Sequence, residues 1–188
     1  HHVDIATWAM GKTNTGPISI DPVMVKHPVP FQNGYPTVDN QFNTATEFLI
    51  NADYADGMQL IIRHDLDNGI LFEGTEGRIF ANRGRLSGKA VEELSSRPLP
   101  EGAVEKIYKD RPLTDHFRNF FDAVAARKEP VSDVFSHHRA LTTCHLAGIA
   151  IRLGRKITWN PQAERIIGDD QAQKLISRDK RKGFEIEM

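Results

Sequence analysis

The sequence predicts an α+β fold: an open, predominantly antiparallel β-sheet with helices packed on one face. Two observations predict it. Between residues 44 and 82, short apolar or alternating runs follow one another and are separated by turn residues, without helices between them. Between residues 113 and 153, apolar residues instead recur with the spacing of a helix.

The composition indicates a single globular domain. The chain has 188 residues and a formal net charge of −1, so one domain spanning residues 1–188 is expected. The balanced charge predicts no nucleic-acid partner. No run approaches the roughly 20 apolar residues of a membrane-spanning helix. Cys144 is the single cysteine, which excludes a disulfide within the chain.

The first element is predicted to be a helix over residues 4–10. Ile5, Trp8 and Ala9 recur at helical spacing and form its expected apolar stripe. Gly11 follows directly and suits the left-handed position just beyond a helix end.

The next segment is extended and then irregular. Residues 17–20 and 23–25 are predicted to be extended, with Pro22 separating them. Residues 26–43 are rich in proline, glycine, asparagine and aspartate, which is typical of a long loop. Loops of this length are more often functional or interfacial than idle.

A meander follows the loop. Residues 44–54 alternate, with Phe48 and Ile50 on one face and Leu49 on the other, and a hairpin turn at Asp56-Gly57 comes next. Tight turns without helical crossovers predict one antiparallel sheet. The four predicted strands cover residues 44–54, 58–64, 70–73 and 77–82.

Two longer helices follow. Thr114 is the expected N-cap of the first, which ends at Glu129-Pro130. Its apolar stripe consists of Phe117, Phe120, Phe121 and Val124. Ser132 or Asp133 is the expected cap of the second helix, which ends at Gly154.

The last elements are a short strand and a short helix. Residues 156–159 have the composition of a strand, and Asn160-Pro161 predicts a turn. Asp169-Asp170 then predicts the start of a helix that runs through Leu175.

Neither a metal site nor a dinucleotide site is predicted from the spacing. The histidine pairs 1–2 and 137–138 are adjacent residues, which point about 100° apart on a helix and make no natural chelate. No glycine-rich dinucleotide fingerprint occurs. No cofactor-binding residue is therefore assigned within this chain.

The best candidates for chemistry are the first four residues. His1, His2 and Asp4 combine side chains suited to proton transfer with one suited to hydroxyl groups. The alternative is that the two leading histidines are the remnant of an affinity tag. A tag alone does not explain an aspartate and an amphipathic helix in the same register.

Four segments carry a resemblance to a known family. HHVDIATWAMG at residues 1–11 resembles the opening of the second domain of Gfo/Idh/MocA oxidoreductases, the glucose–fructose oxidoreductase and inositol dehydrogenase group. The order of the other three segments along the chain supports the same family. They are FEGTEGRIFANRG at 72–84, DHFRNFFDAVAARKEPVSD at 115–133 and HHRALTTCHLAGIAIRLGRKITWNP at 137–161.

The resemblance implies a role for the first residues. The catalytic histidine of the family falls on His1, and an aspartate that contacts sugar hydroxyls falls on Asp4. The aspartate that precedes this histidine in the family would lie before residue 1. His2 and Tyr35 are secondary candidates for substrate contacts, and Tyr35 is equally well interpreted as an interface residue.

The resemblance also implies partners outside this chain. NAD or NADP is held mainly by an N-terminal Rossmann domain that carries a catalytic lysine, and that domain is absent from this chain. The expected substrate is a sugar or polyol, and the free sheet face is expected to form a homo-oligomer. The isolated chain is expected to be inactive as a dehydrogenase.

Two alternatives to simple dehydrogenation stay open at this point. Some relatives hydrolyse glycosides with NAD through a transient keto-sugar, and nothing in the sequence separates the two activities. As an isolated fragment, the chain would also fit a non-catalytic assembly module. The compartment is left open between cytoplasm and periplasm.

Overall fold

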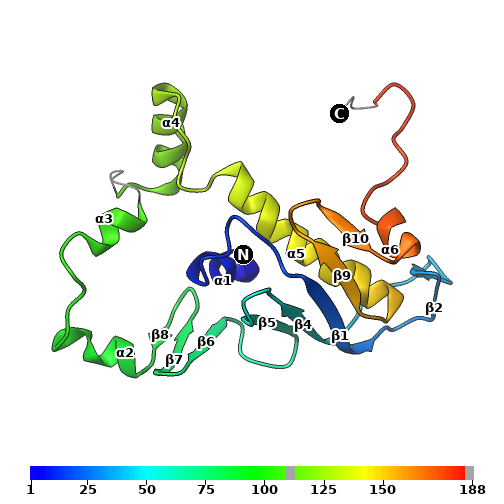
Figure 1. Ribbon diagram of the computed structural model, residues 1–188, viewed down its shortest axis with the longest axis horizontal. Coiled ribbons are helices and arrows are strands. Elements are labelled where there is room, and N and C mark those ends of the chain that lie inside the picture. The colour runs from blue at the N-terminus through cyan, green and yellow to red at the C-terminus, as the bar shows by residue number, and fades with distance from the viewer. Residues whose placement is uncertain (109–112, 185–188) are drawn as a thin grey trace. The chain divides into compact units, whose positions relative to one another are not determined.

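The computed structural model describes residues 1–108 and 113–184 (Figure 1). The internal contacts divide the chain into two compact units. Unit 1 consists of residues 1–10 and the described residues of 67–138, and unit 2 of residues 11–66 and those from 139 onward. The assignment of residues 1–188 to one domain stays a prediction.

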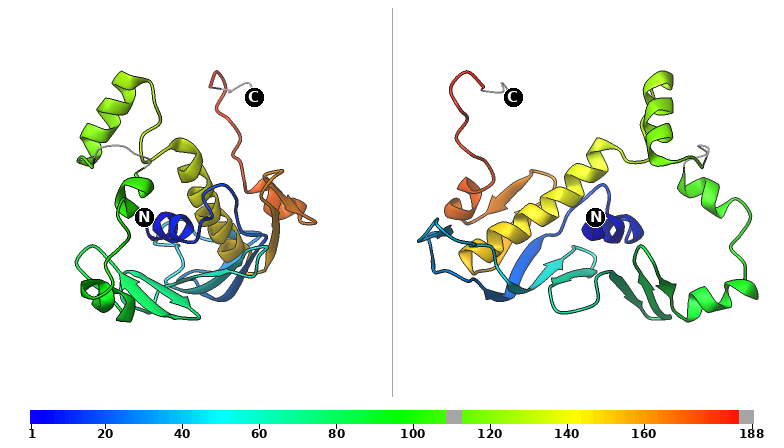
Figure 2. Two further views of the ribbon diagram at one scale, coloured as in Figure 1. Left: turned by 60° about the vertical axis from the view of Figure 1, so that its left-hand side comes forward. Right: turned by 180° about the vertical axis from the view of Figure 1, so that it is seen from behind.

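The predicted α+β class is confirmed. Every strand pairing in the described residues is antiparallel. The strands form open sheets of five, three and two strands. Helices accompany the sheets (Figures 1 and 2).

Unit 2 is built on the five-stranded sheet, whose strand order is β10-β9-β1-β4-β5. Its strands are β1 (Ser19–Lys26), β4 (Glu47–Asp53), β5 (Gln59–Arg63), β9 (Ile157–Asn160) and β10 (Arg165–Ile167). Alternation along β4 directs Ile50 and Ala52 into the core and leaves their neighbours on the opposite face.

Helices α5 (Val134–Leu153) and α6 (Asp170–Lys174) pack on the core face of this sheet. Leu146 and Ala150 of α5 and Ala172 of α6 are buried in the same cluster as the inward side chains of the strands. Small residues let the helices approach the sheet closely, and Gly154, with φ of 62°, ends α5 as predicted.

Two sequence predictions for unit 2 need correction. Pro22 does not divide the first extended segment, because β1 is continuous and absorbs the proline in a register shift between Asp21 and Met24. The loop over residues 26–43 is also not wholly irregular. It contains a small hairpin of β2 (Phe31–Gln32) and β3 (Tyr35–Pro36).

Asn33 and Gly34 form the turn of that hairpin, and both have positive φ, 54° and 82°. Gly34 is buried, and a Cβ atom there would lie 3.1 Å from Leu153 and 3.2 Å from Leu175. The turn therefore packs directly on the end of α5 and on the residue after α6.

Unit 1 holds the three-stranded sheet, in the order β6-β7-β8. The prediction of one meander through four strands is wrong, because β5 and β6 lie in different sheets. The chain changes unit between Leu66 and Asp67. The elements of unit 1 are α1 (His2–Ala9), β6 (Ile70–Gly74), β7 (Gly77–Ala81), β8 (Leu86–Ser87), α2 (Lys89–Glu92), η1 (Glu93–Ser95), α3 (Ala103–Ile107), α4 (His116–Ala126) and the first turn of α5.

The helices of unit 1 differ from their predicted details. Asp115, not Thr114, is the N-cap of α4, because its Oδ1 accepts the backbone N–H of Arg118 at 3.1 Å. The helix ends at Ala126, where Arg127 takes a left-handed φ of 50°, rather than at Glu129-Pro130.

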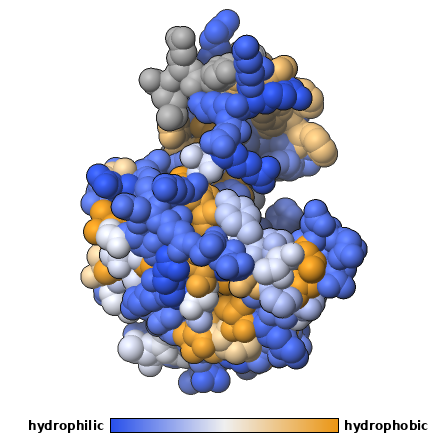
Figure 3. All heavy atoms as spheres, turned by 90° about the vertical axis from the view of Figure 1, so that its right-hand side faces the viewer, coloured by the Kyte–Doolittle hydropathy of each residue, from blue (hydrophilic) through white to orange (hydrophobic). Residues whose placement is uncertain are grey.

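The expected apolar stripes of α1 and α4 are not buried. In α1 the buried side chains are Ala6 and Thr7, whereas Ile5 and Trp8 are exposed. In α4 the predicted stripe also faces solvent; it consists of Phe117, Phe120, Phe121 and Val124. Figure 3 shows that apolar side chains reach the surface between hydrophilic ones elsewhere as well.

None of the helices in residues 1–108 and 113–184 combines the length and the apolar character needed to cross a bilayer.

The core of unit 2 gives a first testable prediction. Ile50 of β4 is 1% exposed in the core cluster that includes residues of α5, so Ile50→Ala should lower the free energy of unfolding by about 2–5 kcal/mol through lost burial and a cavity. Urea denaturation measures the change. Ile176→Ala is the matched control, because Ile176 is 41% exposed and should lose about 0.5 kcal/mol or less. Equal losses in both variants would contradict this account of the core.

The cap of α6 gives a pH-dependent prediction. The pKa of Asp169 is lowered mainly by the hydrogen bond that its carboxylate accepts from the backbone N–H of Ala172. The nearby Arg155 lowers it further. A lowered folded-state pKa means that the carboxylate stabilises the fold above its unfolded pKa of about 4, and that this contribution is lost as the pH falls. Asp169→Ala should therefore be less stable than the parent by about 1 kcal/mol at neutral pH. The difference should shrink in urea titrations repeated toward pH 3, and a difference that grew there would refute the assignment.

Candidate functional site

An open pocket of about 580 Å³ lies within unit 1 and collects polar side chains from four segments. His1 and Asp4 come from the start of α1, and His116 from the start of α4. Glu129 comes from the connection between α4 and α5, and His137 from the first turn of α5. These segments are distant in sequence, so the pocket is a product of the fold.

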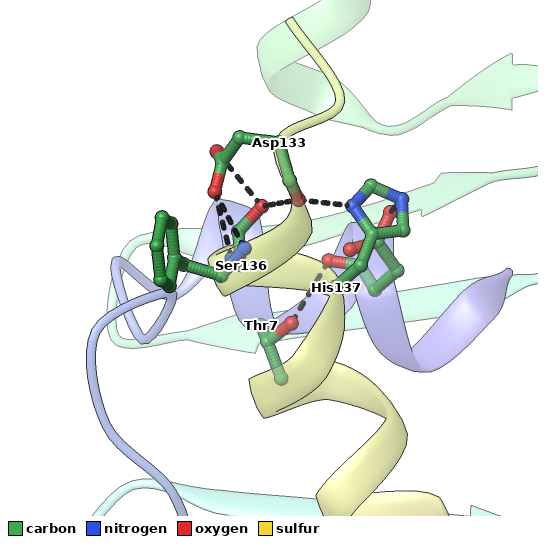
Figure 4. A network of polar contacts seen from close by, with 6 residues as sticks. Thr7, Asp133, Ser136 and His137 are labelled. Carbon is green, nitrogen blue, oxygen red and sulfur yellow. Dashed lines mark hydrogen bonds and ion pairs between the residues drawn. The ribbon is translucent and has the colours of Figure 1, made fainter. Parts of the chain in front are cut away.

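The start of α1 positions His1 and Asp4. His1 is the N-cap residue, its backbone carbonyl accepts the N–H of Ile5 at 3.1 Å, and the residue is exposed. Asp4 lies in the first turn, where the positive end of the helix dipole stabilises a carboxylate. The buried Thr7 hydroxyl donates to the backbone carbonyl of Asp4 at 2.9 Å, which holds this turn in place (Figure 4).

The His137 ring faces Asp4 in a defined tautomer. Its Nδ1 lies 2.9 Å from the carbonyl oxygen of Asp133, and a carbonyl can only accept, so Nδ1 carries the proton. Nε2 lies 3.7 Å from Oδ2 of Asp4, which is an ion-pair distance when the ring is protonated and too long for a hydrogen bond. The Asp4 carboxylate is therefore left able to accept hydrogen bonds from a ligand.

Asp133 fixes the turn that carries His137. Its Oδ1 accepts the backbone N–H groups of Phe135 at 3.0 Å and Ser136 at 2.9 Å. Its Oδ2 accepts the Ser136 hydroxyl at 3.0 Å, as Figure 4 shows. Asp133 is thus the cap of α5, one of the two residues that the sequence predicted for this role.

The charge of the pocket is negative or neutral. Its titratable side chains are three carboxylates and three imidazoles, from Asp4, Glu129, Asp133, His1, His116 and His137. Among the described residues that line it, none is lysine or arginine. Phe120 and Phe135 add aromatic surface. This combination suits a neutral, hydroxyl-rich ligand with an apolar face better than an anion.

Two of the four predicted site residues line this pocket. His1 and Asp4 line the pocket together, whereas His2, which is half-buried, is not among its lining residues. Tyr35 belongs to unit 2, where it lies in β3 and is exposed. The guanidinium of Arg152 lies 4.9 Å from the centre of its ring.

Sequence reasoning missed His116, Glu129, Asp133 and His137 as members of this pocket. From the sequence, His137 is identified only as one of an adjacent histidine pair that makes no natural chelate. One available signal was the spacing of Asp133 and His137, which are one helical turn apart directly after a helix junction. Their approach to α1 is a tertiary contact that the sequence pattern does not encode.

No group of three or more histidine, cysteine or acidic side chains in the described parts of the chain is arranged to hold a metal ion.

Comparison with known protein families gives a match over nearly the whole chain. The model of the oxidoreductase family, C-terminal alpha/beta domain (the second C-terminal form in Gfo/Idh/MocA proteins), matches residues 1–186. No curated protein and no solved structure matches the chain. The matched range covers nearly all 188 residues. The chain therefore belongs to the Gfo/Idh/MocA oxidoreductase family, as a C-terminal α/β domain.

Proposed function

We propose that this domain is the substrate-binding half of an NAD(P)-dependent oxidoreductase that acts on a hydroxyl group of a sugar or polyol. His1 is the general acid/base, and Asp4 binds a neighbouring hydroxyl. The observation that carries the proposal is that both side chains line one open pocket, together with His137.

The role of His1 follows from its chemistry and its position. An imidazole titrates near neutral pH, so it can take a proton from a hydroxyl during oxidation and return it during reduction. His1 is exposed at the pocket, which leaves its ring accessible to a substrate oxygen. The nicotinamide cofactor, when bound, accepts or supplies the hydride, and this chain handles the proton.

Asp4 and His137 complete the polar part of the site. At 3.7 Å from Nε2 of His137, the Asp4 carboxylate forms an ion pair only when that ring is protonated, and it makes no hydrogen bond to the ring. Asp4 can therefore accept a substrate hydroxyl, and such a hydrogen bond fixes which carbon of the sugar faces His1. The His137 ring beside it is itself held by the backbone carbonyl of Asp133.

The pocket does not fit the phosphates of a dinucleotide. A pyrophosphate needs arginine, lysine or a set of backbone N–H groups, whereas this lining supplies Asp4, Glu129 and Asp133 as carboxylates. This mismatch supports a cofactor held mainly by another domain. The same charges favour an unphosphorylated substrate, since a sugar phosphate would be repelled.

The outer face of the five-stranded sheet is the proposed interface with a second copy of the chain. Met24 and Leu49 are cross-strand partners on this face. Ile61 of β5, the partner of Asn51, is on the same face, and Arg63 is the partner of Leu49. Met24 and Ile61 are exposed. Exposed apolar side chains on a sheet face support a homo-oligomer, which the family resemblance also implies.

The role of His1 can be tested in the complete enzyme, with its dinucleotide-binding domain present. His1→Ala should lower kcat by a factor of about 10²–10⁴, because the general acid/base is lost. Steady-state reduction of NAD or NADP, measured over a panel of neutral sugars and polyols, gives the rate. His2→Ala is the matched control and should stay within a few-fold of the parent. A His1→Ala enzyme as active as the His2→Ala enzyme would rule out the assignment.

The interface can be tested by the state of association. Ile61→Lys should shift the protein toward monomers in sedimentation velocity at micromolar concentration, because burying a lysine opposite a second copy leaves an unpaired charge. Ile176→Lys, an equivalent change away from this face, should leave the association unchanged. A parent protein that is already monomeric would defeat the interface proposal and leave the assignment of His1 intact.

A further inference from the structure

A second pocket, of about 330 Å³, lies wholly within unit 2. It is bounded by the C-terminal end of α5, by the β2–β3 hairpin and by the first turn of α6. Arg152 and Arg155 line it, and none of its described lining residues is acidic. Its charge is therefore opposite to that of the pocket around His1 and Asp4.

Arg155 already has a counter-charge, the carboxylate of Asp169. Its Nε donates to Oδ2 of Asp169 at 2.8 Å, and its Nη2 donates to Oδ1 at 2.9 Å. The same Nη2 donates to Oε1 of Gln171 at 2.8 Å. Because the oxygen of the Gln171 amide is occupied in this way, its NH₂ group remains as a donor at the pocket.

Arg152 has no such counter-charge. Its Nε donates to the backbone carbonyl of Gly34 at 2.7 Å, and its guanidinium lies over the Tyr35 ring. In the described residues, no carboxylate lies within ion-pair distance of it. These two contacts hold the side chain in place through its Nε atom and the face of its guanidinium group. They do not use the Nη1–Nη2 edge, which can bind two oxygens of one oxyanion side by side.

We propose that this pocket binds a small organic anion whose carboxylate or phosphate group sits on the Nη1–Nη2 edge of Arg152. The amides of Asn33 and Gln171 supply further N–H donors. The carbon skeleton packs on apolar surface from Val25 and Phe31. The Phe31 ring is itself stacked on His27, with ring centres 3.9 Å apart, so this wall is well supported.

The position of the pocket also indicates which anions bind best. The C-terminal end of α5 carries partial negative charge, which works against a bare inorganic ion. Apolar contact with the ligand can offset that repulsion. Benzoate and phenyl phosphate are therefore expected to bind at least about fivefold more tightly than inorganic phosphate. Comparing the two aromatic probes identifies the preferred head group.

Isothermal titration of the purified protein with these three probes tests the site without any activity measurement. Arg152→Gln should weaken binding of the better aromatic probe by at least about tenfold, because the bidentate contact is lost. Arg165→Gln is the matched control: it removes the same charge from an exposed position on β10 in the same unit, and affinity should not change.

A second variant covers the case in which loss of the Arg152–Gly34 contact impairs folding. Arg152→Lys keeps a cation and a donor but cannot bind two oxygens with a planar edge, so its affinity should fall between those of the parent and Arg152→Gln. The proposal is overturned if no probe binds the parent up to about 10 mM. It is equally overturned if Arg152→Lys or Arg152→Gln, folded by circular dichroism, binds as tightly as Arg165→Gln.

Discussion

The arrangement of the candidate site depends on the carboxylate of Asp133. By accepting the N–H groups of Phe135 and Ser136, it fixes where α5 begins. Its backbone carbonyl accepts Nδ1–H of His137, and this sets both the tautomer and the direction of that ring. Nε2 is then aimed at Asp4 at the start of α1. A single cap residue thus connects a helix start, a proton position and the direction in which the His137 ring faces Asp4.

The fold was predictable from the sequence where the signal is local. The Asp133 and Gly154 ends of α5 are set by side chains and dihedral angles within one turn, and the structure has them as expected. The division between β5 and β6 was not predictable in this way. Each strand has a regular pattern, but which strand pairs with which is decided by contacts distant in sequence.

The candidate site was predictable only in part. Family resemblance pointed to His1 and Asp4, and the fold brings both to one pocket. The resemblance said nothing of His137 or Glu129, because their approach to α1 follows from how unit 1 packs. Tyr35 is a candidate that the structure does not bring to this pocket. A polar aromatic residue in a loop is a reasonable candidate for substrate contacts, yet Tyr35 belongs to unit 2, where its ring lies beneath Arg152. The roles of His1, Asp4 and His137 in binding and catalysis stay proposals.

Gly34 limits how far this scaffold can diversify. Two independent requirements meet there, a φ of 82° and a space bounded by Leu153 and Leu175. Its carbonyl also accepts from Arg152. Replacing Gly34 would strain the turn and also disturb the hydrogen bond from Arg152, so substitutions at this position are expected to be unfavourable. Variation in the hairpin is less restricted at the flanking Gln32, whose side chain is exposed.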